Sequence, residues 1–98
     1  MLNFYKQSEV FLISLADSIE KRDLNSLFDV EYSDGILTIT IHETKQEYVI
    51  NRHIANQKIW YSSPFSGADY FAFNNDKWVN KNGEKLEEKL FLELKNLF

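Results

Sequence analysis

The central segment Tyr48–Pro64 reads YVINRHIANQKIWYSSP, and the rest of the chain is arranged around it. Two short runs of good strand formers, Tyr48–Ile50 and Ile59–Tyr61, flank the dipeptide Ala55–Asn56. Asparagine favours turns, so we expect this dipeptide to join the runs as a hairpin. Pro64 is expected to end the second strand, because proline cannot donate a hydrogen bond to a sheet ladder.

Successive side chains of a strand point to opposite faces, so this hairpin should have two different faces. The apolar face carries Tyr48, Ile50, Ile59 and Tyr61. The other face carries Asn51, Lys58, Trp60 and Ser62. Polar side chains around a single tryptophan are not typical of a core. The stretch therefore predicts a sheet that is buried on one side and open on the other.

The same stretch resembles the signature of the frataxin family, including its bacterial CyaY-like branch. The matching positions are Asn51, Ile59, Trp60, Ser62, Ser63 and Pro64. The later run Lys77–Val79 and Gly83, which precedes the final helical pattern, also match. The resemblance covers nearly the whole chain, although the helices match only in their apolar pattern. It implies a two-layer sandwich with both helices on one sheet face.

Composition indicates one compact domain, since the chain has 98 residues, of which 44% are hydrophobic and 15% aromatic. The net charge of −4 disfavours nucleic acid and anionic membranes as partners and favours cations or basic protein surfaces. Cysteine is absent, which excludes disulfides, thiolate metal sites and cysteine nucleophiles. That absence also fits a reducing compartment.

The beginning of the chain bears on its location. Met1 leads almost directly into a helical pattern, so we expect no signal or transit peptide. The longest apolar run, around Val10–Leu15, is too short to span a bilayer. The bacterial cytoplasm is the simpler expectation. A mitochondrial matrix protein would require a transit peptide that has been removed.

Periodicity predicts a helix, a meander of about six strands and a second helix. Apolar residues recur at spacings of three and four over Asn3–Arg22, with Asn3 as the N-cap. Alternating patterns predict the other strands, and Asp34–Gly35 is a two-residue hairpin signal between the first two. The predicted ranges are Phe28–Ser33, Ile36–His42, Asp69–Phe73 and Lys77–Val79, followed by a helix from about Glu84 or Lys85 to the C-terminus. Two amphipathic helices can cover only one face, which makes the fold α+β.

Acidic residues gather around the end of the first helix and in the first strand. They are Asp17, Glu20, Asp23, Asp29 and Glu31. Residues three apart are neighbours on a helix, and residues two apart point the same way from a strand. If the strand runs back beside the helix, these side chains form one ridge. Carboxylate oxygens suit hard cations, including ferrous or ferric iron.

The residues alone favour a solvated surface over a metal site at this ridge. The resemblance alters that weighing, because frataxins carry an acidic ridge on this helix and strand. Lys21, Asn25 and Leu27 stand where some bacterial relatives place further acids. Iron is therefore expected to bind weakly.

The open sheet face is a candidate partner surface, formed by Asn51, Lys58, Trp60 and Ser62. Tryptophan is a preferred interface anchor, although a neighbouring side chain or loop could instead cover Trp60. The resemblance favours the interface, because the matching surface in the family contacts the iron–sulfur assembly machinery.

Other chemistry has little support in the sequence. His42 and His53 have no metal-ligand spacing, and only the neighbour of His42, Glu43, suggests a weak extra cation site. There is no glycine-rich phosphate loop and no evident local Ser–His–acid arrangement. We therefore expect a protein that is not an enzyme.

The resemblance implies an iron-binding protein of iron–sulfur cluster assembly. It would bind a cysteine desulfurase through the ridge and the scaffold protein through the Trp60 face, as a regulator, an iron donor or both. A monomer is expected, which iron could drive into an oligomer. The first alternative is a ferroxidase that detoxifies iron by oxidising ferrous iron at the ridge. The second is a pure interaction module in which metal binding is incidental.

Overall fold

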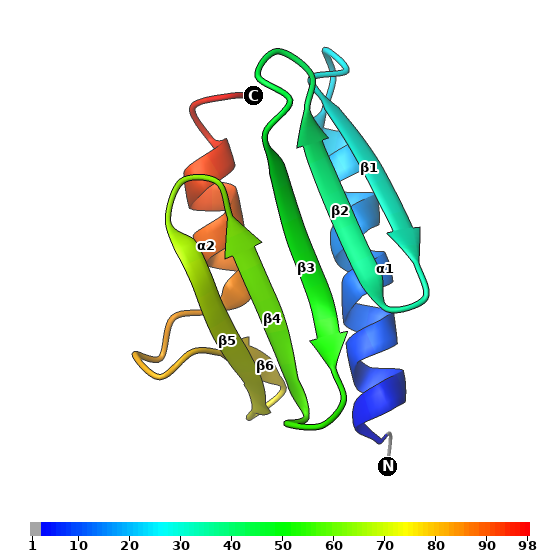
Figure 1. The fold of residues 1–98 in the computed structure, drawn as a ribbon, viewed down its shortest axis with the longest axis vertical. Helices are drawn as coiled ribbons and strands as arrows, with labels where there is room; N and C mark the ends of the chain where they lie inside the picture. The colour runs from blue at the N-terminus through cyan, green and yellow to red at the C-terminus, as the bar shows by residue number, and fades with distance from the viewer. Residues whose placement is uncertain (1–2) are drawn as a thin grey trace.

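The computed structural model describes residues 3–98 and contains two helices and six strands. In chain order the elements are α1 (Phe4–Arg22), β1 (Phe28–Ser33), β2 (Ile36–Ile41), β3 (Glu47–His53), β4 (Lys58–Ser63), β5 (Gly67–Asn74), β6 (Lys77–Val79) and α2 (Leu86–Leu94). The strands form one antiparallel meander in the order β1-β2-β3-β4-β5-β6. Both helices lie behind the sheet in Figure 1, α1 behind its β1 half and α2 behind its β4–β5 half. The predicted α+β sandwich is confirmed.

The core lies between the sheet and the helices, because alternate residues of every central strand are apolar. On the sheet side, fully buried residues include Leu37, Ile39, Tyr48, Ile50, Ile59, Tyr61 and Phe71. On the helix side they are Leu12, Ile19, Leu86, Leu90 and Leu94. The helix residues recur at the spacing of one helical face. The opposite sheet face is left open, as the central hairpin predicts.

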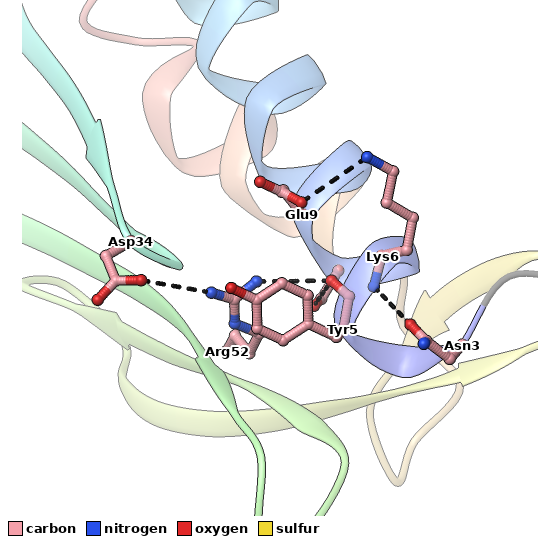
Figure 2. A network of polar contacts seen from close by, with 7 residues as sticks. Asn3, Tyr5, Lys6, Glu9, Asp34 and Arg52 are labelled. Atoms are coloured by element: carbon pink, nitrogen blue, oxygen red, sulfur yellow. Dashed lines mark hydrogen bonds and ion pairs between the residues drawn. The ribbon is translucent and has the colours of Figure 1, made fainter.

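The turn between β1 and β2 is the predicted two-residue hairpin. Asp34 and Gly35 both have positive φ, 48° and 80°, which is the backbone of a type I′ turn. Glycine is needed here for a second reason: a Cβ at Gly35 would lie 2.5 Å from Nη2 of Arg52. The Arg52 side chain of β3 is only 5% exposed and stacks on the Tyr5 ring of α1, 3.8 Å from its centroid. This contact fixes the start of α1 against the hairpin end of the sheet (Figure 2).

The two ends of α1 follow the sequence signals. Asn3 caps the helix, since its Oδ1 accepts the N–H of Lys6 at 2.9 Å, as Figure 2 shows. Asp23 ends it at the predicted place. Neither helix in the described part of the chain has the length and apolar character needed to cross a membrane.

The prediction that the last helix reaches the C-terminus is wrong. α2 ends at Leu94, whose carbonyl accepts the N–H groups of Leu97 and Phe98 at 2.8 and 3.2 Å. The chain beyond Leu94 makes one further hydrogen-bonded turn, and the centroid of the Phe98 ring lies 5.5 Å from that of Phe28 and 6.4 Å from that of Phe91. These aromatic contacts partly cover the apolar end of the helix layer.

Candidate functional site

Two of the predicted ridge residues, Asp17 and Glu20, lie on α1. Ser18 and Lys21 lie on the flank of α1 that faces α2, where they line a hollow between the two helices. The helical period places Glu20 on the opposite flank, which faces β1 (Figure 1). Asp17 faces outward with its side chain 61% exposed, and its Oδ2 pairs with Lys21 Nζ at 2.9 Å. Of these two residues, Glu20 therefore points toward β1. The charge of Asp17 is partly neutralised by Lys21.

Asp29 and Glu31 lie on β1 and point to the open side of the sheet, as predicted. Both are exposed, and Oδ1 of Asp29 lies 2.8 Å from Nε2 of His42. The hydrogen bond to Asp29 raises the pKa of His42 above its ordinary value. The sequence suggested Glu43 as the acidic neighbour of His42, whereas the fold places Asp29 beside it, diagonally across the β1–β2 pair, in which Asp29 is directly opposite Thr40.

Asp23 has a structural task that the sequence did not reveal. Its two carboxylate oxygens accept the N–H groups of Leu27 at 2.7 Å and Phe28 at 3.0 Å. These bonds hold the loop between α1 and the start of β1. A cation at Asp23 would therefore have to share oxygens that already accept backbone hydrogen bonds.

The structure distributes the five acids over α1, the loop after it and β1, and they do not form a closed cage. Within residues 3–98, no three His, Cys, Asp or Glu side chains come together in a way that could hold one metal ion. Such a surface attracts hydrated cations and basic proteins through summed charge. It suits weak, open cation binding with most ligands supplied by water.

The open face places the predicted partner residues on adjacent strands. Asn51, Trp60 and Tyr70 are direct neighbours across β3, β4 and β5, and His53 and Lys58 form the next cross-strand pair. Lys58 is exposed, while Asn51, Trp60 and Ser62 are half-buried. The Tyr70 ring packs edge-on against Trp60 with centroids 4.9 Å apart. A neighbouring side chain therefore covers one side of the indole, and the rest remains accessible.

Sequence reasoning missed the aromatic neighbours of Trp60. The Tyr70 ring contacts both Trp60 and His53, and the centroid of the His53 ring is 5.7 Å from that of Tyr70. The signal was present in the alternation of β5, where Ala68, Tyr70 and Ala72 share the open side. His53 Nδ1 is buried without a hydrogen-bond partner in the described structure.

A second missed feature is a polar cluster on the helix side of the sheet, centred on Glu93 of α2. Its Oε1 accepts hydrogen bonds from the hydroxyls of Tyr48, Tyr61 and Ser63 at 2.8, 3.0 and 2.7 Å, and its Oε2 accepts one from Ser66 at 2.7 Å. Burial alone would raise the pKa of Glu93, but these four hydrogen bonds outweigh it and lower the pKa. Burial, reinforced by Glu93, raises the pKa values of both tyrosines.

This cluster explains part of the Ser-Ser-Pro signature. Ser63 is 6% exposed, and its Oγ also accepts the N–H groups of Phe65 and Ser66 at 3.0 and 3.1 Å. Ser62 points to the open face, whereas Ser63 ties the β4–β5 turn to α2. The two serines therefore have different tasks.

Comparison with known proteins gives a consistent result over the whole chain. The family model described as a frataxin-like domain matches residues 2–98. The frataxin homolog of Saccharomyces cerevisiae mitochondria is 35% identical over 95 residues, which are 93% of this chain and 54% of that protein. Mitochondrial frataxin of Dictyostelium discoideum is 41% identical over 73 residues, 71% of this chain and 37% of the relative. The chain thus spans about half or less of these relatives.

Solved structures show the same similarity. Trimeric frataxin from Saccharomyces cerevisiae, complexed with ferrous iron, superposes with a TM-score of 0.83 at 33% identity, covering 98% of this chain and 88% of that one. A frataxin from Psychromonas ingrahamii, of the CyaY protein family, gives a TM-score of 0.60 at 24% identity, covering 88% of this chain and 90% of that one. The similarity to this second protein shows the fold alone.

Proposed function

The chain belongs to the frataxin-like family, and we propose that it is an iron-binding protein that acts in iron–sulfur cluster assembly. It would regulate a cysteine desulfurase, present iron to the scaffold protein, or do both. The desulfurase would bind at the acidic ridge and the scaffold at the face of Asn51, Lys58, Trp60 and Ser62. Its contribution would be binding and positioning, without making or breaking bonds.

The observation that carries the proposal is that α1 and β1 both carry exposed carboxylates. Glu20, Asp29 and Glu31 are exposed where the end of the helix approaches the edge strand. Oxygen ligands of this kind suit ferrous or ferric iron. The yeast relative that is complexed with ferrous iron supports the choice of metal.

We expect iron to bind at the ridge with micromolar or weaker affinity, that is, about −8 kcal/mol at most. Titrating ferrous iron without oxygen should shift or broaden the backbone amide signals around Asp17, Glu20, Asp23, Asp29 and Glu31. The double variant Asp29→Asn with Glu31→Gln should lose most of this response. Binding should also weaken as pH falls, because the ligands must be deprotonated.

The matched control for iron binding is Glu87→Gln with Glu88→Gln, which removes the same charge from α2. This variant should respond to iron like the unmodified chain. If the Asp29 and Glu31 variant keeps the full response while the control loses it, iron binds elsewhere.

Binding of a cysteine desulfurase should be salt-dependent if the ridge meets a basic patch. We expect the affinity to fall as salt rises from about 50 to 500 mM, over which the Debye length shortens severalfold. Replacing Asp17 and Glu20 with lysine should weaken the complex without unfolding the domain. The same charge reversal at Glu87 and Glu88 is the control. If neither salt nor the lysine replacements at Asp17 and Glu20 change the affinity for the desulfurase, docking at the ridge is contradicted.

The ferroxidase alternative requires closely paired iron sites and turnover with oxygen. Sustained oxygen consumption with excess ferrous iron would favour it over binding alone. Stoichiometric desulfurase binding in the presence of a chelator would instead favour the pure interaction module.

The proposed location is a compartment that assembles iron–sulfur clusters. This is the bacterial cytoplasm, or the mitochondrial matrix if a transit peptide has been removed. The names of the yeast and Dictyostelium relatives support a mitochondrial location. The proposed resting state is a monomer that iron could drive into an oligomer, and the trimeric yeast structures support an oligomer.

A further inference from the structure

The outer edge of β1 has backbone hydrogen-bonding groups that no other element uses. β1 pairs with β2 on one side only, and Figure 1 shows no element beyond its other side. In this register Leu27 faces His42, and the N–H of His42 donates to the Leu27 carbonyl at 3.0 Å. Hydrogen-bonded pairs alternate with non-bonded pairs along an antiparallel ladder, so Asp29 and Glu31 bond to β2. The N–H and C=O groups of Phe28, Val30 and Tyr32 therefore point away from β2, to the outer edge.

The first outward donor is already occupied. Asp23 Oδ2 accepts the Phe28 N–H at 3.0 Å, which caps the edge where the strand begins. Among residues 3–98, no hydrogen bond engages the outward N–H groups of Val30 and Tyr32. The exposed edge therefore offers two donors, together with the alternating carbonyls of Phe28, Val30 and Tyr32.

The side chains beside this edge determine what kind of strand could join it. On the open side of the sheet they are Asp29 and Glu31, both exposed. On the helix side they are Val30 and Tyr32 of β1, which pack partly buried against the core. The α1 flank behind them carries Ile13, 49% exposed, together with Glu9 and Glu20. A joining strand would therefore place basic side chains on the open side beside Asp29 and Glu31, and apolar ones on the helix side beside Val30 and Tyr32, in strict alternation.

We propose that β1 accepts an extended, alternating basic and apolar segment of a partner protein by strand addition, extending the sheet beyond its first strand. The inference deepens the proposed function, because the desulfurase is the partner whose basic surface would supply the segment. Backbone hydrogen bonds to Val30 and Tyr32 would fix the register, and Asp29 and Glu31 would select positive charge. A second copy of this chain is a poor occupant, since pairing two β1 edges would bring four carboxylates together.

The edge can be tested with a defined probe, the peptide acetyl-Lys-Val-Lys-Val-Lys-Val-Lys-amide. Its binding should slow amide exchange at Val30 and Tyr32 of the unmodified chain at least about tenfold, and exchange at Asp29 and Glu31 should change less, because those amides already bond to β2. The variant Val30→Pro should bind the peptide at least about tenfold more weakly than Val30→Ala, since proline removes one outward donor. Both variants lose the valine side chain, so their difference reports the backbone.

Proline at position 30 removes no bond of the β1–β2 ladder, and edge strands tolerate proline when its missing N–H faces solvent. The amide spectrum outside β1 should confirm that the variant is folded, and the exchange measurement on the unmodified chain needs no variant. Equal peptide affinities of the two variants, or unchanged exchange at Val30 and Tyr32, would overturn strand addition. A dimer of the unmodified chain that Val30→Pro abolishes would overturn the choice of occupant.

The same two variants separate this inference from the proposed function. If the desulfurase binds Val30→Pro and Val30→Ala equally well, strand addition fails while the proposed function stands. If the desulfurase does not bind the unmodified chain, the proposed partner fails, and the peptide measurement still decides whether the edge accepts a strand.

Discussion

Replacing Glu93 with alanine is expected to lower the free energy of unfolding by about 3 kcal/mol, because it leaves buried hydroxyls without an acceptor. The side chains of Tyr48 and Tyr61 are fully buried, and both hydroxyls donate to Oε1 of Glu93. Ser63 loses its acceptor in the same step, which loosens the turn after β4. Chemical denaturation of the unmodified chain and the variant measures the loss.

The control on the same helix is Glu88→Ala. Glu88 is 68% exposed and makes a surface ion pair with Lys85 at 3.5 Å, so its removal should change stability by less than about 0.5 kcal/mol. Equal losses from both variants would mean that helix propensity or surface charge, and not the hydroxyl cluster, stabilises this region. Tyr61→Phe should cost less than Glu93→Ala, since it removes one donor and leaves no carboxylate unpaired.

The Glu93 cluster should also make stability depend on pH. The pKa of Glu93 is lower in the folded chain than its ordinary value, so the unfolded chain binds the proton first as pH falls. Its contribution is therefore complete above the pKa of the unfolded side chain and is lost as pH falls through the folded pKa. Glu93→Gln cannot ionise, so its stability should fall less steeply over the same acidic range. Identical acid profiles would show that other carboxylates account for the loss.

The parts of the fold that sequence could predict are those that depend on neighbouring residues. Asp34–Gly35 predicts its own turn because both residues must adopt positive φ, and the period of each strand follows from its own alternation. The path after Leu94 could not be predicted in this way. Leu97 and Phe98 continue the helical pattern, yet the Phe98 ring finds Phe28, seventy residues earlier in the chain, as its packing partner.

In the candidate site, too, the features set by neighbouring residues could be predicted and those set by the fold could not. The residue types on α1 and β1 predict an acidic surface, because each pair of carboxylates is set by a local period. The role of Asp23 depends on how the loop to β1 is folded, and the pairing of Asp29 with His42 depends on strand register. The hydrogen bonds of Glu93 were the hardest feature to predict. Its tyrosine partners lie 45 and 32 residues away in the chain and become its neighbours only when α2 packs on the sheet.

Ile59 and Trp60 are adjacent in β4, and replacing each with alanine should have opposite effects on stability and binding. Ile59 is fully buried beneath the helices, so Ile59→Ala should cost about 2–5 kcal/mol, the range for large-to-small changes in a core. Ile59→Val provides a graded control at about 0.5–1.5 kcal/mol. Trp60 is half-buried on the open face against Tyr70, so Trp60→Ala should cost only about 1 kcal/mol, mainly from the lost aromatic contact.

Binding to the iron–sulfur scaffold should follow the reverse order. A tryptophan at the centre of an interface typically contributes at least about 2 kcal/mol, so Trp60→Ala should weaken scaffold binding roughly thirtyfold. Ile59→Ala should leave the affinity of the folded fraction unchanged, because its side chain does not reach the open face. Affinity and unfolding should be measured on the same preparations, at a temperature where Ile59→Ala is still mostly folded. If both variants lose similar stability while binding is unaffected by Trp60→Ala, the indole is a structural part of the sheet, and the scaffold docks elsewhere.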